Sequence, residues 1–138
     1  SQHRAYFDTH IKPRIDGKWI EYLGLLSQSE LAPIYRKAAA VLFLINWCEP
    51  FGLVAAEAQA SGTPLISTRK GALPEIIIHG RTGFVVDSVD EAVRAAGELG
   101  TISPEDCRAN AESRFSAESM ARGYERVYEV ALRGRGKH

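Results

Sequence analysis

The sequence lacks the features that mark several specialised classes of protein. Its 138 residues include two cysteines, Cys48 and Cys107, whose spacing fits neither a disulfide framework nor a zinc site. No apolar run is long enough to span a membrane, and no signal peptide opens the chain. Nothing in it resembles a nucleophile triad or a Gly-x-x-x-x-Gly-Lys phosphate loop. We therefore expect a cytoplasmic protein without a bound metal.

An excess of one charge is also missing. Seventeen basic and seventeen acidic side chains cancel, so no overall field attracts nucleic acid. The basic tail at residues 133–138 is a local exception, and we expect it to be solvated. The composition, with 45% apolar and 25% charged residues, is typical of a single soluble globular domain.

What the sequence does contain is an alternation of strand and helix patterns. Strands are expected at residues 18–24, 39–45, 64–68 and 82–87. Helices are expected from residue 1 to near Pro13, at residues 27–38, 53–61, 73–79 and 88–100, from residue 104 onward, and at 116–132. The run at 39–45 is continuously apolar, which predicts a strand covered on both faces. The alternation predicts an α/β fold that is Rossmann-like, with a mostly parallel sheet and helices on both faces.

Local signals predict several helix ends. Ser27 and Glu30 match a capping box at the start of one helix. Ser103 is expected to cap another helix, with Pro104 at its first position. Gly62 is expected to end the helix that begins at Leu53.

Two glutamates lie eight positions apart around one predicted strand-to-helix loop. Ligands of this class of fold bind outside the carboxyl ends of the strands, which is where Glu49 falls. The amides of Phe51, Gly52 and Leu53 open the next helix, and such an N-terminus binds phosphate well. Carboxylates at Glu49 and Glu57 are suited to accept hydrogen bonds from vicinal hydroxyls. The pattern is typical of a site for a sugar joined through a diphosphate to a ribonucleoside.

A simpler interpretation stays open on spacing alone. Glu57 could merely complement the helix dipole, a contribution of about 0.3–1 kcal/mol, and Glu49 could be a solvated loop residue. Trp47, close to the acids, could line the sugar pocket or cover the end of the sheet.

The segment "EPFGLVAAEAQASGTPLIST", with "GALPEII" and "GRTGFVV" after it, resembles a known family. It is similar to the C-terminal half of the family 4, or group 1, glycosyltransferases, which are retaining enzymes of the GT-B fold. The resemblance implies that Glu49 contacts the hydroxyls of the donor sugar as the catalytic group, and that Glu57 binds the ribose hydroxyls. The amides of Phe51, Gly52 and Leu53 would hold the diphosphate. Weaker candidates to flank the nucleobase are Ile20, Glu21, Tyr22 and Leu23.

The resemblance also implies what the chain does and lacks. Residues 1–138 would be a partial donor-binding domain of a hexosyltransferase-type enzyme, a C-terminal GT-B domain lacking its first two strands. The N-terminal acceptor domain would be absent. The donor would be a UDP- or GDP-sugar, with no cofactor or metal. We expect this chain alone to be inactive, and peripheral membrane association of the parent protein at the inner face stays open.

The missing strands raise a structural question. A strand at 18–24 would have no neighbour on the side that faces 39–45, and unpaired strand edges are costly. We expect a companion chain, a second copy, or direct pairing of the two strands to fill the gap. Two rival functions are a non-catalytic nucleotide-binding or interaction module and a GT-B-fold sugar-nucleotide epimerase.

Overall fold

The computed structural model describes residues 2–135 and divides the chain into two compact units, Ser1–Leu31 and Ala32–His138. The last three residues of the basic tail therefore lie outside the described residues. In the described part, no helix is long and apolar enough to cross a membrane. The second unit holds the sheet and is described first.

The second unit is built on a three-stranded parallel sheet with the order β1-β2-β3. Its strands are β1 (Val41–Phe43), β2 (Leu65–Thr68) and β3 (Gly83–Val86). Leu42 is in register with Ile66, which in turn is in register with Phe84. The predicted α/β fold with a parallel sheet is therefore confirmed.

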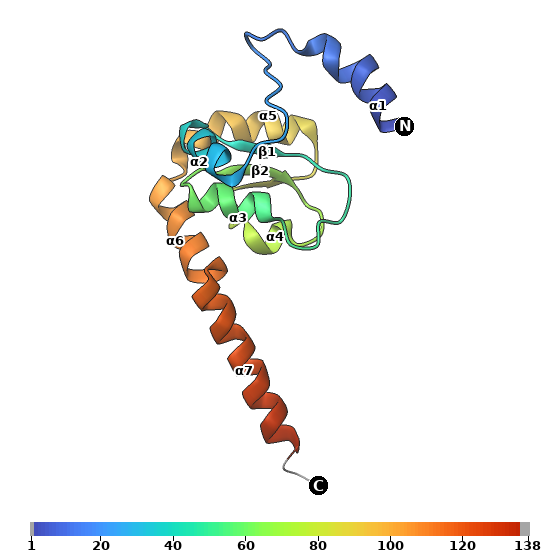
Figure 1. The fold of residues 1–138 in the computed structure, drawn as a ribbon. Coiled ribbons are helices and arrows are strands. Elements are labelled where there is room, and N and C mark those ends of the chain that lie inside the picture. The colour runs from blue at the N-terminus through green and yellow to red at the C-terminus, as the bar shows by residue number, and fades with distance from the viewer. Residues whose placement is uncertain (1, 136–138) are drawn as a thin grey trace. The chain divides into compact units, whose positions relative to one another are not determined.

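Helices cover both faces of this sheet because successive strand residues point to opposite sides. Figure 1 shows α3 (Leu53–Ala60) and α4 (Leu73–Ile76) on one side and α5 (Val89–Glu98) on the other. Leu65 of β2 packs in the core cluster with residues of α3 and α4, and Ile66 packs in a second cluster with residues of α5. A 3₁₀ turn (Leu99–Thr101) then leads to α6 (Pro104–Phe115) and to the long α7 (Ala117–Arg135).

The predicted capping residues act as expected. The Ser103 hydroxyl accepts the backbone N–H groups of Glu105 and Asp106, and Pro104 is the first residue of α6. Gly62 follows the end of α3 with φ +82°, a conformation that glycine adopts without strain. In the first unit, the N–H of Ser27 donates to the Glu30 carboxylate as α2 (Gln28–Lys37) begins. Local side-chain chemistry thus fixes these ends.

The strand predicted at residues 18–24 is wrong. No strand forms there, because the preceding loop uses the backbone groups that a strand would need. One carboxylate oxygen of Asp16 accepts the N–H groups of Lys18, Trp19 and Ile20. These bonds to the carboxylate lower the pKa of Asp16. Direct pairing of this segment with β1 is therefore also wrong, whereas pairing with another chain is untested.

The first helix differs in detail from its prediction. It comprises α1 (Gln2–Tyr6), a π-helical turn (Phe7–Ile11) and a 3₁₀ turn (Lys12–Arg14). Pro13 lies inside this last turn, so the helical run ends one residue after the predicted stop.

The prediction that residues 39–45 are covered on both faces is also wrong. Val41 and Phe43 pack on the core, but the side chains of Leu42 and Leu44 are 64% and 42% exposed. Among the described residues, β1 pairs with β2 alone, so it forms one edge of the sheet.

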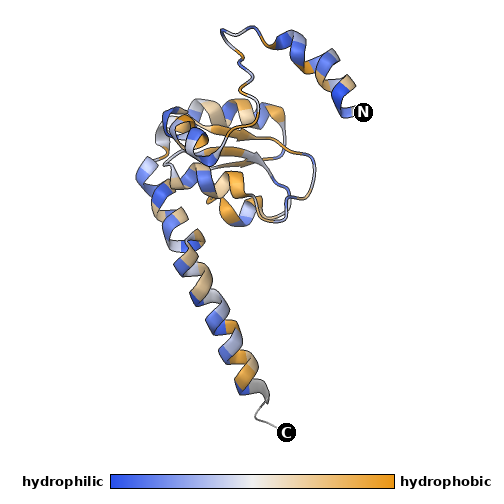
Figure 2. Ribbon diagram, viewed as in Figure 1, coloured by the Kyte–Doolittle hydropathy of each residue, from blue (hydrophilic) through white to orange (hydrophobic). Residues whose placement is uncertain are grey.

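The helix α7 carries a second exposed apolar surface. Met120, Tyr124 and Val127 recur at helical spacing and are each about 60% exposed. Figure 2 shows polar and apolar residues alternating along this helix. The pattern is that of an amphipathic helix.

Candidate functional site

The loops that follow the three strands meet at one edge of the sheet because the strands are parallel. The loop after β1 carries Trp47 and Glu49 and ends at α3. The loops after β2 and β3 are joined by an ion pair between Arg69 and Asp87, with 3.3 Å between Nε and Oδ1. This edge is where the sequence places the candidate site.

The main chain of Glu49 is held by the neighbouring loop. The N–H of Ala72 donates to the carbonyl oxygen of Glu49 over 2.9 Å. Gly71, with φ +55°, lies so close to the same residue that a Cβ at this position would collide with the Glu49 backbone. The two loops can meet only because residue 71 is glycine.

The side chain of Glu49 has its own partner. The indole Nε1–H of Trp47 donates to Oε2 of Glu49 over 3.0 Å. Glu49 is half-buried, while Trp47 is 55% exposed. The described residues place no hydrogen-bond donor on the other carboxylate oxygen, Oε1.

The N-terminus of α3 has the features of an anion site. Its N-cap is Gly52, with φ 91°, and no side chain of the described residues caps it. The first turn carries no acidic residue that would neutralise the dipole. Gly52 is buried, and a Cβ there would lie 3.0 Å from a methyl group of Leu73. The first amides of α3 therefore have no internal acceptor in the helix.

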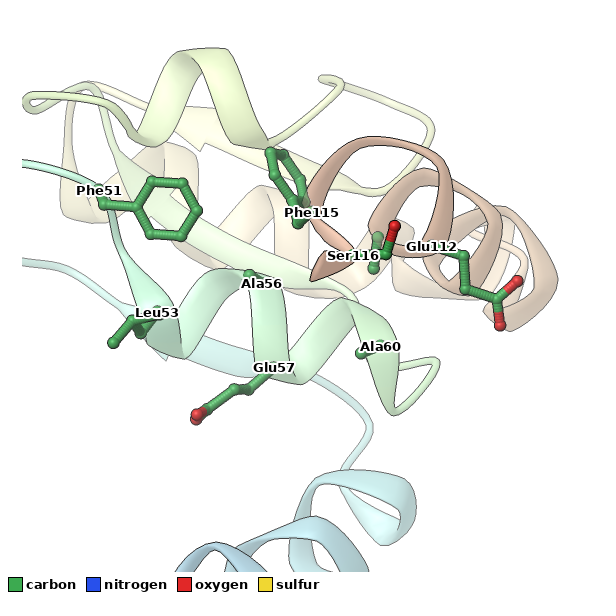
Figure 3. A pocket seen from close by; sticks show the side chains of 9 residues that line it. Phe51, Leu53, Ala56, Glu57, Ala60, Glu112, Phe115 and Ser116 are labelled. Carbon is green, nitrogen blue, oxygen red and sulfur yellow. The ribbon is translucent and has the colours of Figure 1, made fainter. Parts of the chain in front are cut away.

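A cavity of about 320 Å³ lies between α3 and α6. Figure 3 shows it, with Glu57 and Leu53 extending from α3 on one side and Phe115 on the other. The rings of Phe51 and Phe115 meet edge to face, with 5.9 Å between centroids. The lining residues are Phe51, Leu53, Ala56, Glu57, Ala60, Ala111, Glu112, Phe115 and Ser116. This is a mostly apolar cavity with acidic side chains at its border.

Glu57 affects a tyrosine that is also part of the core. Tyr35 packs against the cluster formed by α3 and α4. Burial, and after it the negative charge of Glu57, raise the pKa of the Tyr35 hydroxyl. Glu57 is itself half-buried, so its charge acts in surroundings less polar than water.

The structure brings some of the predicted site residues together. Phe51, Leu53 and Glu57 line one cavity, and Gly52 caps the helix between them. Glu49 is not among the residues that line this cavity. Its Cγ would instead lie 3.6 Å from a Cβ on Gly52, which places it beside the start of α3.

The weaker candidates for the site come from both compact units. Trp47 contacts Glu49 directly. The residues Ile20, Glu21, Tyr22 and Leu23 belong to the first compact unit and form no strand. Their assignment rested on the end of a strand that does not form.

Sequence reasoning missed two features of the site. The first is the contact of Gly71 with Glu49, although a glycine in a loop that follows a strand often marks such a close approach. The second is Phe115, which lies far from Phe51 along the chain and packs against it. In the described part of the chain, no three His, Cys, Asp or Glu side chains gather closely enough to hold a metal ion.

Comparison with known proteins identifies relatives. The model of the family described as "Glycosyl transferases group 1" matches residues 2–114. A D-inositol 3-phosphate glycosyltransferase from Corynebacterium kroppenstedtii is 38% identical over 126 residues. That match covers 86% of this chain and 28% of the relative, so the chain spans less than a third of that relative's length.

Solved structures share the fold. Sucrose-phosphate synthase from Thermosynechococcus elongatus matches with a TM-score of 0.70 and 22% identity, over 97% of this chain and 35% of that protein. Anabaena Alr3699/HepE, solved in complex with UDP-glucose, matches with a TM-score of 0.66 and 19% identity. That match covers 94% of this chain and 36% of HepE.

Proposed function

The chain belongs to the glycosyl transferases of group 1, and from this membership we propose that it is the donor-binding part of a sugar transferase. The donor is a sugar carried on a nucleoside diphosphate, and the transfer is of the hexosyl type. Relatives named as glycosyltransferases and a solved neighbour that holds UDP-glucose support this proposal. The acceptor site belongs to the remainder of the protein or to a companion chain.

The observation that carries the proposal is the N-terminus of α3. An uncapped helix start, without an acid in its first turn, offers the amides of Phe51, Gly52 and Leu53 to an anion. A diphosphate has the matching charge. The left-handed Gly52 turns the chain so that these amides follow directly on the loop of Glu49.

The two glutamates are assigned to the hydroxyl groups on either side of the diphosphate. Glu49, beside the helix start, binds the hydroxyls of the donor sugar, and Glu57, one turn inside α3, binds the ribose. Hydrogen bonds to a carboxylate are about twice as strong as those between neutral groups. The acids therefore contribute both affinity and orientation.

The chemistry follows from this placement. The bond between the anomeric carbon and the phosphate oxygen breaks, and the diphosphate leaves with the electron pair. The acceptor hydroxyl oxygen bonds to the same face of the sugar and gives its proton to the leaving diphosphate, so configuration is retained. The positive end of α3 stabilises the charge that develops on the leaving diphosphate, without a metal. The chain alone binds donor weakly and transfers nothing, since the acceptor site is elsewhere.

Calorimetric titration with UDP- and GDP-sugars tests the proposal. We expect Glu57→Ala to weaken donor binding about 10- to 150-fold, the loss of a charge-assisted hydrogen bond of about 1.5–3 kcal/mol. Glu112→Ala is the matched control, because Glu112 borders the same cavity from α6 and has no assigned role. Donor binding that Glu57→Ala leaves undiminished would refute the ribose assignment.

A further inference from the structure

The position of Trp47 gives it a role that depends on the proposed function and extends it. We propose that Trp47 is a positioning residue, which holds the Glu49 carboxylate in the orientation that binds the donor sugar. The indole does so through the 3.0 Å hydrogen bond from its Nε1–H to Oε2. Trp47 itself need not contact the donor.

The main chain of Glu49 is already fixed. The N–H of Ala72 binds its carbonyl oxygen, and Gly71 packs against its backbone. The remaining freedom lies in the rotatable bonds of the side chain. A glutamate that loses this freedom only on binding its ligand weakens the binding by the entropy of ordering.

The bond from Trp47 removes much of that freedom in advance. An indole has one N–H donor and a rigid ring, so it fixes the carboxylate oxygen that it binds. The bond is charge-assisted, which makes it stronger than one between neutral groups. Trp47 precedes Glu49 by two residues in the same loop, so the loop brings its own positioning group.

The oxygen that Trp47 does not bind is available for a ligand. The described residues place no donor on Oε1, and Oε2 keeps further acceptor capacity. A sugar hydroxyl that donates to Oε1 would therefore meet an acceptor that is already oriented. Loss of the indole N–H should weaken binding of the sugar part of the donor and leave binding of the nucleotide part unchanged.

The first experiment tests the bond without any ligand. The chain has two tryptophans, Trp19 and Trp47, and hence two indole N–H signals in a ¹⁵N–¹H NMR spectrum. We expect Glu49→Gln to move the Trp47 signal upfield, because a neutral acceptor binds the proton less strongly. The Trp19 signal serves as the internal control and should not move. An unchanged Trp47 signal would overturn the proposal.

The second experiment separates positioning from a merely structural role. We expect Trp47→Phe, which keeps a ring and removes the N–H donor, to weaken UDP-glucose binding about 3- to 10-fold. Binding of UDP, which lacks the glucose that Glu49 would hold, should stay the same. Trp19→Phe is the matched control and should change neither affinity, since Trp19 is 83% exposed and lies in the other compact unit.

The outcomes distinguish the two proposals. If Trp47→Phe weakens UDP and UDP-glucose alike, or neither, Trp47 does not position the acid and the inference is wrong. If the unmodified chain binds neither ligand, the proposed function fails and the inference falls with it. The NMR result would then describe a bond without this role.

Discussion

At the scale of single residues, the place of Glu49 depends on a glycine in a different loop. Gly71 has a left-handed backbone and lies directly against the main chain of Glu49. Its lack of a side chain is what allows Ala72 to donate its N–H to the Glu49 carbonyl. Any larger residue would have to push the two loops apart.

We therefore expect Gly71→Ala to destabilise the protein by about 1–3 kcal/mol or more, from backbone strain and the collision together. The matched control is Gly97→Ala in α5, where a Cβ would meet nothing within 4 Å. That change should stabilise the fold by up to about 1 kcal/mol. Urea unfolding followed by circular dichroism measures both, and equal effects of the two changes would contradict this account.

The buried Cys107 gives the stability a specific dependence on pH. Burial raises the pKa of its thiol from about 9 to about 11. The folded state therefore keeps a proton that the unfolded state loses, so the free energy of unfolding should fall as the pH rises above about 9 and level off near 11.

Urea unfolding between pH 8 and 11 tests this, with Cys107→Ala compared to the unmodified chain so that other titrating groups cancel. The variant should show the smaller decline. Cys48→Ala is the control, because Cys48 is exposed and its removal keeps the buried Cys107 thiol. The same decline in all three proteins would show that Cys107 is not responsible.

Some residues of the site could be predicted from the sequence and others could not, for a physical reason. The acids and the helix start are neighbours in sequence, so their spacing indicates them. The contacts of Gly71 with Glu49 and of Phe115 with Phe51 depend on how distant segments meet. The bond between Trp47 and Glu49 is local, but it depends on side-chain rotamers that the sequence does not specify.

At the scale of elements, a buried polar network joins α6 to α3. The Asn110 amide donates to the side-chain oxygen of Gln59 over 2.6 Å and to the carbonyl of Ile76 over 3.0 Å. Gln59 is fully buried, and Asn110 nearly so. A buried polar group that loses its hydrogen-bond partner costs more free energy than the bond contributes. Separation of α6 from α3 would leave the buried Asn110 and Gln59 side chains unpaired, so the network holds the two helices together.

We expect Asn110→Ala to lower the free energy of unfolding by about 1–3 kcal/mol, because it leaves the Gln59 oxygen without a partner. With Gln59→Ala in addition, the combined effect should differ from the sum by about 0.5–3 kcal/mol. Ser113→Ala, on the exposed side of α6, is the control and should cost less than about 0.5 kcal/mol. Additive effects in a double-mutant cycle by urea unfolding would exclude the network.

Elements were predictable where local chemistry decides them. The Ser103 cap and the Gly62 stop were both correct because each acts on the backbone of its own helix. The strand at 18–24 failed because its alternation competed with the Asp16 carboxylate, which accepts three N–H groups. The burial of 39–45 failed because burial depends on what packs against a strand.

At the scale of the whole molecule, the hydrophobic core lies in one of the two compact units. Both core clusters, with the residues packed on them, come from residues between 35 and 115. The described residues of the first unit, Ser1–Leu31, are in neither cluster. The sheet should therefore fold without it.

We expect the truncated chain 27–138, which keeps Ser27 and Glu30 at the start of α2, to unfold cooperatively. Its free energy of unfolding should lie within about 1 kcal/mol of that of the full chain. Thermal and urea unfolding of both proteins measure this, and a truncation starting at residue 32, without the cap, is the comparison. Loss of the cooperative transition in 27–138 would show that the sheet needs the first unit.

The uncovered flank of β1 has a practical consequence for any preparation of this polypeptide. In the described residues, the main-chain groups on one side of β1 have no strand partner, and the side chains of Leu42 and Leu44 beside them are exposed. Unpaired strand edges template the addition of further copies. Concentrated solutions of the protein should therefore become turbid and form β-rich aggregates on standing. The substitution Leu42→Lys, which places a charge on this edge strand, should prevent the aggregation.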